Sequence, residues 1–333
     1  MTVPAAALAA VAMAGQSAVA ARPSPDRAYL EDVIGLSSSE IREIHAGQAL
    51  TTTLSSRAGQ EVVTFGAVRV RRPAPEVLRS LRTLAVSPLG INERRHAISQ
   101  PTRLSDWSPL SLTSEAMSKL PGCRPGRCPV QLPAHAIARL RDGATDAEVR
   151  QVVHDVVADY QRAGHRALQP YADRDPATSP SSEYRRLLSA AEYLPVPLAA
   201  LRSALDTYPS APQVALESDF YWSVQDFGMK PTLRVFHRVV ADEAAVADPS
   251  GHVAGAMATL QVLATHYFSS SLEWHIVVRD PADSGAAFVY HLTRSWTPGL
   301  SGLRGAMARS SAKRNGREAV AEYLEHARRM VEG

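Results

Sequence analysis

The sequence TLRVFHRVVAD (residues 232–242) alternates between two kinds of side chain. One set of alternate positions is mainly apolar and comprises Leu233, Val235, His237 and Val239. The other set comprises Arg234, Phe236 and Arg238. Because successive strand residues point to opposite faces of a sheet, this period of two predicts a β-strand with one mainly apolar face.

Two later segments, THYFSSSLEWHIVVR (residues 265–279) and AAFVYHLTRSW (residues 286–296), alternate in the same way. The first is expected to place on one face Leu272, Trp274, Ile276 and Val278, opposite Glu273, His275 and Arg279. The second is expected to place on one face Phe288, Tyr290, Leu292, Arg294 and Trp296, opposite Val289, His291, Thr293 and Ser295. The link Asp280–Gly285 has the composition of a turn, so the two segments predict an antiparallel hairpin. Residues 219–223 are a further short strand candidate.

Residues 317–331 predict a terminal helix that lies on this sheet. Apolar residues recur there at steps of three and four: Val320, Tyr323, Leu324, Ala327, Met330 and Val331. Such a stripe is buried against another element, which here is the sheet. The sequence therefore predicts an α+β fold with three or four antiparallel strands and a long C-terminal helix.

The N-terminal part adds a strand and helix pattern. Residues 37–40 (SSSE) open a short helix by the capping rules, and Gly47 ends it. Strands are expected at residues 48–55 and 61–71, and a helix at residues 75–85, which begins with a proline. Residues 92–98 are another strand candidate.

This order of elements resembles the START-like superfamily, also called SRPBCC or helix-grip proteins. The segments that carry the resemblance are Val62–Arg71, Pro75–Leu84, Thr232–Asp242, His266–Arg279, Phe288–Trp296 and Arg317–Val331. The resemblance implies a curved antiparallel sheet that wraps the C-terminal helix and encloses a hydrophobic cavity. Residues 220–223 (FYWS), 227–228, 230–231, 266–268 (HYF) and 271–272 also look like an exported bacterial START-like family of unassigned function.

The middle of the chain departs from that family pattern. Residues 101–210 read as a mostly helical insertion, with helices expected at 134–141, 146–164, 181–193 and 197–208. The insertion would cap the cavity or form a separate helical lobe. Residues 22–333 are interpreted as a single START-like α+β domain.

The first 21 residues resemble a secretory signal peptide without its basic n-region. They carry no charge and end in Ala18–Val19–Ala20, a cleavage pattern of small residues. An exported, soluble protein, periplasmic or extracellular, is expected, and an Ala-rich disordered N-terminus is the alternative. In an exported chain Cys123 and Cys128, which flank a Pro-Gly turn, are expected to form a local disulfide, whereas in the cytoplasm they would be free thiols.

Composition and motifs argue against several function classes. A net charge of +3 over 333 residues does not favour nucleic-acid binding. Nucleotide-binding glycine motifs are missing, so no cofactor is predicted. The strand histidines His237, His266, His275 and His291 lack metal-ligand spacing, and no metal is predicted; structural or solvated histidines are the preferred interpretation. The serines at 269–271 lack a nucleophile elbow.

Arg294 is the residue most suggestive of a site, because it shares its face with large apolar residues. A guanidinium there is costly unless paired, and it can grip a carboxylate or phosphate. The ligand-binding residues are therefore expected to be Arg294, Trp274, Tyr290, Trp296, Phe288 and His237. The alternative is an arginine that reaches solvent or pairs with Glu273 or Asp219.

These observations favour an exported carrier of a hydrophobic small molecule, a lipid, held between the sheet and the C-terminal helix. A basic cluster (Arg304, Arg309, Lys313, Arg314 and Arg317) would allow transient contact with an anionic membrane, or is simply a solvated face. A cyclase- or aromatase-like enzyme that uses Tyr290, Arg294 and His237 is one alternative. A protein-interaction module built on the helical insertion is another, and an exposed apolar stripe on residues 146–164 would support it.

Overall fold

The structure is a computed structural model that describes residues 25–84, 93–111, 120–141, 144–210, 216–226, 230–300 and 302–333. The expected signal peptide lies outside these residues. The described chain begins with α1 (Pro25–Ala28), η1 (Tyr29–Ile34) and α2 (Ser38–His45). The predicted start of α2 is confirmed: Glu40 N–H donates to Ser37 Oγ (3.3 Å), and Ser37 N–H donates to the Glu40 carboxylate (2.7 Å).

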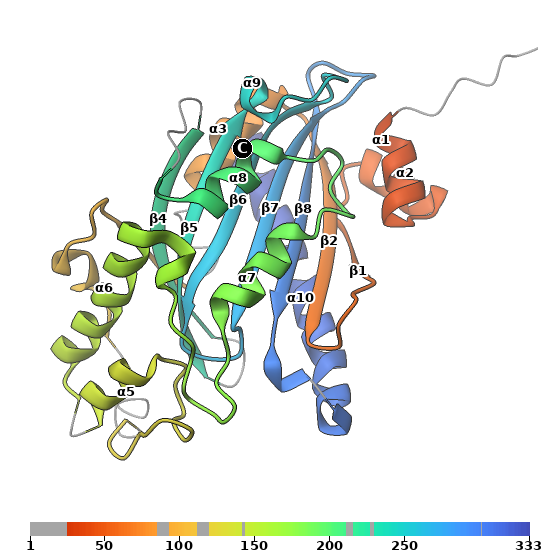
Figure 1. The fold of residues 1–333 in the computed structure, drawn as a ribbon. Helices are drawn as coiled ribbons and strands as arrows, with labels where there is room; N and C mark the ends of the chain where they lie inside the picture. Colours follow the sequence, from red (N-terminus) through yellow and green to blue (C-terminus); the bar gives the residue numbers. More distant parts are fainter. Residues whose placement is uncertain are drawn as a thin grey trace, which may run out of the picture.

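The centre of the fold is a curved antiparallel sheet, and the α+β prediction is confirmed (Figure 1). Its strands are β1 (Leu50–Leu54), β2 (Glu61–Val70), β3 (Arg94–Ile98), β4 (Leu216–Asp226), β5 (Pro231–Asp242), β6 (Val253–Ala264), β7 (Ser270–Arg279) and β8 (Ala287–Trp296). They are ordered β1-β2-β8-β7-β6-β5-β4-β3 in one eight-stranded sheet. Seven of these strands correspond to strand candidates in the sequence, and β6 does not. The early strand β2 pairs with the last strand, β8, along its whole length.

Strand β6 is the central strand that the sequence did not reveal. Its sequence, VAGAMATLQVLA, has no clear alternation, and all twelve residues are buried. A strand that is covered on both faces has no reason to alternate polar and apolar residues, so its period-two signal is lost. The expected strand at residues 265–279 also begins later than predicted, at Ser270.

One face of the sheet, here called the outer face, carries the apolar alternate positions and is covered by helices. These helices are α5 (Ala134–Leu140), α6 (Asp146–Ala163), α7 (Pro180–Ser189) and α8 (Ala199–Thr207), and the N-terminal elements cover its β2 and β8 end (Figure 1). They pack with Phe65, Leu233, Trp274, Tyr290 and Leu292 into one apolar cluster. The stripe on α6 that would have supported an interaction module is buried here, since Val149, Val152, Val153, Val157 and Tyr160 are at most 6% exposed.

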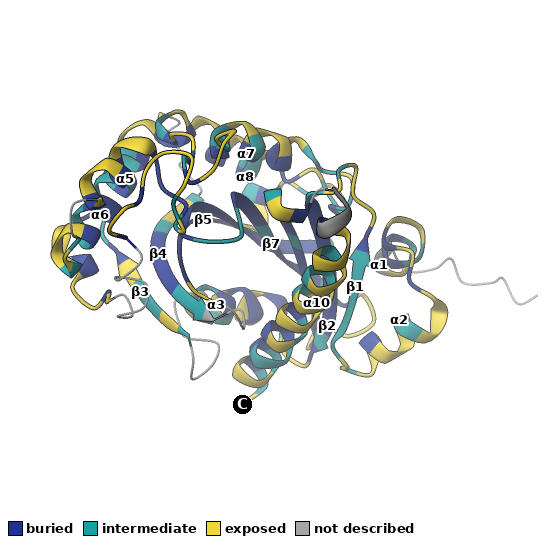
Figure 2. Cartoon of the chain, turned by 90° about the horizontal axis from the view of Figure 1, so that it is seen from below, coloured by how far each residue is buried: buried dark blue, intermediate teal, exposed yellow. Residues whose placement is uncertain are grey.

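The opposite, inner face contacts α3 (Ala74–Leu84) and the C-terminal helix α10 (Gly302–Glu332), which lie inside the curve of the sheet (Figure 2). Helix α10 comes so close to β2 that a Cβ added to Gly66 would lie 2.6 Å from Val320 and 2.7 Å from Leu324. A side chain at Gly66 would therefore push the helix away from the sheet. Helix α10 also begins earlier than the predicted residue 317.

The structure corrects one expectation about these faces. The alternation predicted correctly which residues share a face, but the apolar set does not meet α10. Phe288, Tyr290 and Trp274 lie in the outer cluster, whereas the α10 residues pack with Val68, Val277 and Val289 on the inner face. The helices of residues 134–207 supply a second apolar layer, so the sheet is buried on both sides.

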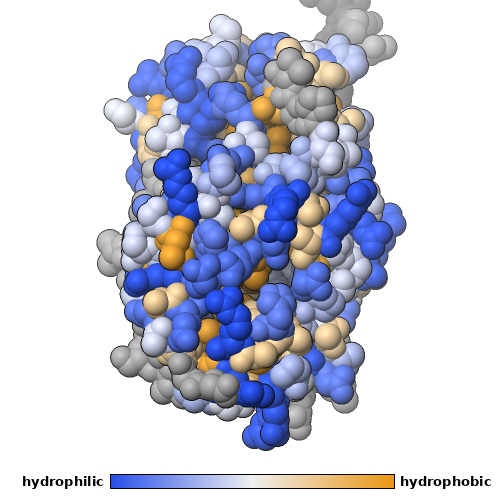
Figure 3. Space-filling model, turned by 60° about the vertical axis from the view of Figure 1, so that its left-hand side comes forward, coloured by the Kyte–Doolittle hydropathy of each residue, from blue (hydrophilic) through white to orange (hydrophobic). Residues whose placement is uncertain are grey.

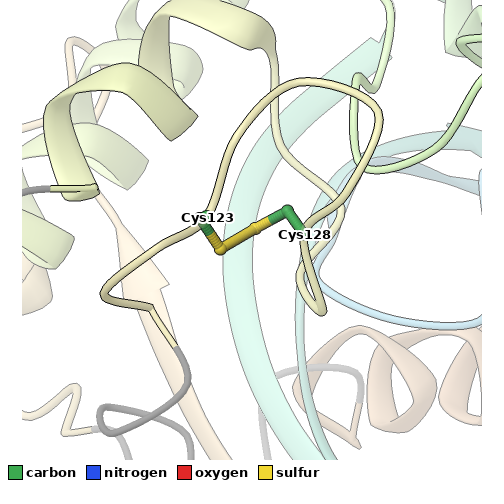
Figure 4. The surroundings of a disulfide bond; sticks show 2 residues. All are labelled: Cys123 and Cys128. Carbon is green, nitrogen blue, oxygen red and sulfur yellow. A yellow bond between two sulfur atoms is a disulfide. The ribbon is translucent and has the colours of Figure 1, made fainter.

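Cys123 and Cys128 form a disulfide with Cα atoms 4.7 Å apart, which agrees with the expected local pairing (Figure 4). The bond closes a loop that is tied to residues 172–173 by backbone hydrogen bonds from Gly126 and Cys128. Seen from the side that carries α5 and α6, the surface is mainly hydrophilic with small, separate hydrophobic spots (Figure 3). Among the described residues, no helix combines the length and apolarity that a membrane span requires.

Candidate functional site

The inner face carries an unusual concentration of buried polar side chains beside α10. We call this set the inner polar cluster, and it comprises Arg234, Gln261, Glu273, His275, His291, Tyr323 and Thr259. Six of the seven are at most 8% exposed, and the side chain of Glu273 is 19% exposed. Buried polar groups are costly unless they are partnered, so such a concentration needs either an internal network or a ligand.

Arg234 is the cation at the centre of this network. Its guanidinium donates to Gln261 (3.0 Å), Ser271 (2.7 Å) and Glu273 (3.4 Å). It also stacks over Phe236, with Cζ 4.5 Å from the ring centroid. Burial lowers the pKa of Arg234 and outweighs the attraction of Glu273, but an arginine stays charged under any ordinary condition.

Two further arginines on the same face have acidic partners. Arg238 forms an ion pair with Asp219 at 2.5 Å, and Arg95 forms one with Glu93 at 2.7 Å. Together with Arg234 and Glu273 this gives three arginines and three carboxylates. The inner face is thus charge-rich but balanced.

His275 and His291 lie directly opposite each other on β7 and β8. Their ring centroids are 4.4 Å apart, and both rings contact Tyr323 of α10, at 4.8 and 4.7 Å. Burial lowers the pKa of His291 to about 4 and that of His275 well below its usual range. Both imidazoles are therefore neutral at physiological pH. Of the two interpretations offered for these histidines, solvated or structural, burial excludes the solvated one at these positions, since each is 4% exposed.

Several polar atoms in the cluster have no hydrogen-bond partner among the residues that the structure describes. They are Nδ1 of His275, Nδ1 of His291, the hydroxyl of Tyr323 and the hydroxyl of Thr259. His237 on the outer face gives the contrast, because its Nδ1 bonds to Tyr160 (2.9 Å) and its Nε2 to Ser218 (2.8 Å). This fold can satisfy a buried histidine completely, and on the inner face it does not.

The residues predicted from the sequence as ligand contacts lie elsewhere. Arg294, Trp274, Tyr290, Trp296, Phe288 and His237 are all on the outer face and at most 5% exposed. They cannot hold a ligand between the sheet and α10, because the sheet itself separates them from that helix. Two strands, β7 and β6, also separate His237 on β5 from β8, which carries Arg294 and Tyr290. The structure does not bring these three together as the enzyme hypothesis required.

Arg294 has structural partners instead. Its guanidinium contacts Glu61 on β2 and Glu192 after α7, both at 2.7 Å, and lies 5.6 Å from the ring of Tyr193. The predicted alternative partners of Arg294 form ion pairs elsewhere: Glu273 with Arg234, and Asp219 with Arg238. Arg294 therefore links the sheet to the helical segment that covers it.

A second candidate is a small apolar pocket on the outer face, between α5, α6 and strands β4 and β5. Its volume is about 60 Å³. Its walls are mainly apolar, with Arg94, Ser111, Thr265 and His266 as the polar exceptions; the apolar lining is Leu120, Val130, Leu132, Leu140, Val149, Val152, Val153, Val224, Pro231 and Leu233. A space of this size admits a few carbon atoms and not a whole lipid.

A third candidate is Glu183 on α7, a carboxyl group with a shifted pKa. Burial raises the pKa of Glu183 to about 7, although a hydrogen bond from the Ser269 hydroxyl favours the carboxylate. Arg186, one turn along α7, stacks over Trp296 with Cζ 4.6 Å from the ring. These contacts attach α7 to β7 and β8, and they account for Ser269 as part of a packed interface, whereas Ser271 contacts Arg234 on the inner face.

The basic cluster before the C-terminal helix is part of α10 itself. Arg309 donates to the backbone carbonyl of Leu300 (2.8 Å), and Arg314 forms only a long, exposed pair with Glu318 (3.9 Å). Arg317 is exposed. These side chains form a largely solvated stretch of the helix.

Sequence reasoning missed the inner polar cluster, although a signal was present. Glu273–Trp274–His275 places a carboxylate and an imidazole on one strand face by the period of two. The cross-strand position of His291 depends on the length of the turn after Arg279, which composition does not specify. No protein-family model, curated protein or solved structure matches this chain.

Proposed function

We propose that this chain is a START-like binding protein that holds a small molecule against the inner polar cluster, between the sheet and α10. The single observation that carries the proposal is the set of unpartnered polar atoms on His275, His291, Tyr323 and Thr259. Buried donors and acceptors are nearly always satisfied in native proteins, so a group of them on one face favours a polar ligand.

The chemistry of the cluster defines the kind of ligand. Neutral imidazoles and hydroxyls each donate and accept hydrogen bonds, and burial raises the pKa of Tyr323 so that its hydroxyl stays protonated. The rings of His275, His291 and Tyr323 add flat apolar surface. We therefore infer an oxygenated small molecule with carbonyl or hydroxyl groups. The Cys123–Cys128 disulfide supports export of the carrier, in a compartment where such bonds persist.

The test compares two tyrosine variants. Native mass spectrometry and organic extraction of the purified full chain identify a co-purifying molecule, and its affinity is then measured by titration. Tyr323→Phe removes an inner-face hydroxyl and should weaken binding about five- to tenfold, the effect of one net hydrogen bond. Tyr160→Phe removes an outer-face hydroxyl bonded to His237 and should leave the affinity unchanged.

Two results would contradict the proposal. One is a bound molecule whose affinity is the same in Tyr323→Phe and in the wild type. The other is a chain that neither carries a molecule from the cell nor binds oxygenated aromatic or lipid probes in titration.

The apolar outer pocket supports a second candidate function, the binding of a small hydrophobic molecule or one end of a longer chain. Val153→Phe would fill this pocket and abolish such binding without touching the inner face. A ligand lost in Val153→Phe and retained in Tyr323→Phe would assign binding to the outer pocket.

A further inference from the structure

We propose that Glu273, His275 and His291 form a binding site for a divalent transition-metal ion such as Zn²⁺ or Co²⁺. One ligand atom from each residue lies within 4.8 Å of the other two. Two histidines and one carboxylate are a common donor set for zinc and for non-haem iron. This inference goes beyond small-molecule binding and does not depend on it, because the metal ion alone would bind.

The backbone holds the three residues in place. Glu273 and His275 are two residues apart on β7, so they share the inner face, and His291 is the register partner of His275 on β8. Glu273 also approaches His291, with its carboxylate 3.8 Å from Nε2. Sites built on paired strands of a sheet centre are rigid, which favours a defined coordination geometry.

The imidazole nitrogens suit metal binding, because a metal ligand must offer a lone pair. Among the residues that the structure describes, neither Nδ1 of His275 nor Nδ1 of His291 has a hydrogen-bond partner. In Zn²⁺ sites the Zn–N distance is about 2.0 Å, so all three ligand atoms would have to move toward the ion by roughly 1 Å.

The charges around the site also allow a cation. Arg234 competes with the metal for Glu273, but its hydrogen bond to that carboxylate is long, at 3.4 Å. If the carboxylate turns toward the metal, the guanidinium retains its hydrogen bonds to Ser271 and Gln261. Arg238 and Arg95 retain their own carboxylates. Tyr323 and Thr259 remain available to a small molecule beside the metal.

The experiment uses the full chain after treatment with a chelator, and the probes are Co²⁺ and Zn²⁺ alone. We expect one equivalent of Co²⁺ to bind with a visible absorption spectrum and Zn²⁺ to displace it. Glu273→Gln, His275→Gln and His291→Gln should each weaken binding by roughly tenfold or more. Circular dichroism of each variant verifies the fold, and a variant that does not fold is replaced by the corresponding alanine variant.

Two controls separate this site from others. His252→Gln removes a histidine outside the triad, and Tyr160→Phe removes a hydroxyl bonded to His237 on the outer face; both should bind metal as the wild type does. The proposal is wrong if the wild type shows no saturable binding of either ion, or if the three triad variants bind as tightly as the controls. Neither result would affect the small-molecule titrations, so the two proposals fail separately.

Discussion

His275 and His291 face each other across β7 and β8 with ring centroids 4.4 Å apart, and in the described part of the chain Nδ1 of each has no hydrogen-bond partner. His237 lies on the other face of the same sheet with both ring nitrogens bonded. The same residue type thus has a completed hydrogen-bond network on the outer face and an incomplete one on the inner face.

The burial of His237 makes stability depend on pH. Burial lowers its pKa to about 3, whereas an unfolded histidine titrates near 6.5. The unfolded state therefore binds more protons between these values, and the free energy of unfolding should fall as the pH drops from 6.5 to 3, by roughly 5 kcal/mol from this residue. Denaturant unfolding at several pH values measures this. His237→Phe should reduce the slope, and an unchanged slope would contradict the assignment.

Glu183 should give the stability a pH dependence opposite to that from His237. Its pKa is raised to about 7, above the ordinary value of 4.5, so the folded state holds the proton more tightly. Its contribution to stability is complete below pH 4.5 and is lost as the pH rises through 7. The protection of α7 amides against hydrogen exchange, corrected for the intrinsic pH dependence of exchange, should fall across this range in the wild type and not in Glu183→Gln. Equal profiles in the two proteins would refute a role for this carboxyl group.

Arg294→Met should be strongly destabilising. It removes the partner of Glu61, a carboxylate only 6% exposed, and of Glu192. Breaking a buried pair from one side typically costs about 3 to 5 kcal/mol. Chemical denaturation should show this loss, and Glu61→Met in the same chain should recover part of it. The control Arg314→Met, at an exposed pair, should change stability by less than about 0.5 kcal/mol.

Gly66→Ala should loosen the packing of α10 on β2. The added Cβ would lie 2.6 Å from Val320 and 2.7 Å from Leu324, so the helix or its side chains must shift. Overpacking of this kind costs about 1 to 3 kcal/mol. Thermal unfolding should show the decrease. Gly299→Ala is the matched control, since nothing lies within 4 Å of its added Cβ, and a similar loss in both variants would exclude the packing explanation.

The disulfide should contribute measurably although its loop is short. Cys123 and Cys128 are five positions apart, and closure of so small a loop lowers the entropy of the unfolded chain by an amount worth roughly 2 kcal/mol. Unfolding with and without reductant should differ by about this value. Mass spectrometry of the protein in its native compartment should find no free thiol, whereas two free thiols would contradict both the bond and export.

Much of the local structure could be predicted from the sequence. Capping residues located the start of α2, and proline and glycine positions delimited the helices between residues 134 and 207. Strand alternation assigned Arg234, Glu273, His275 and His291 to one face, opposite Val235, Trp274 and Leu292, and the structure agrees. These features depend on neighbours in the chain, and local sequence carries that information.

The face that meets α10, the presence of β6 and the assembly of the inner polar cluster were decided only by the tertiary structure. An apolar face requires cover, but it does not specify which helix covers it, and here α5–α8 take the place expected for α10. Strand β6 is buried on both faces and therefore shows no period. Likewise, His291 comes to lie opposite His275 through the register of a hairpin, a pairing between distant residues that no local pattern specifies.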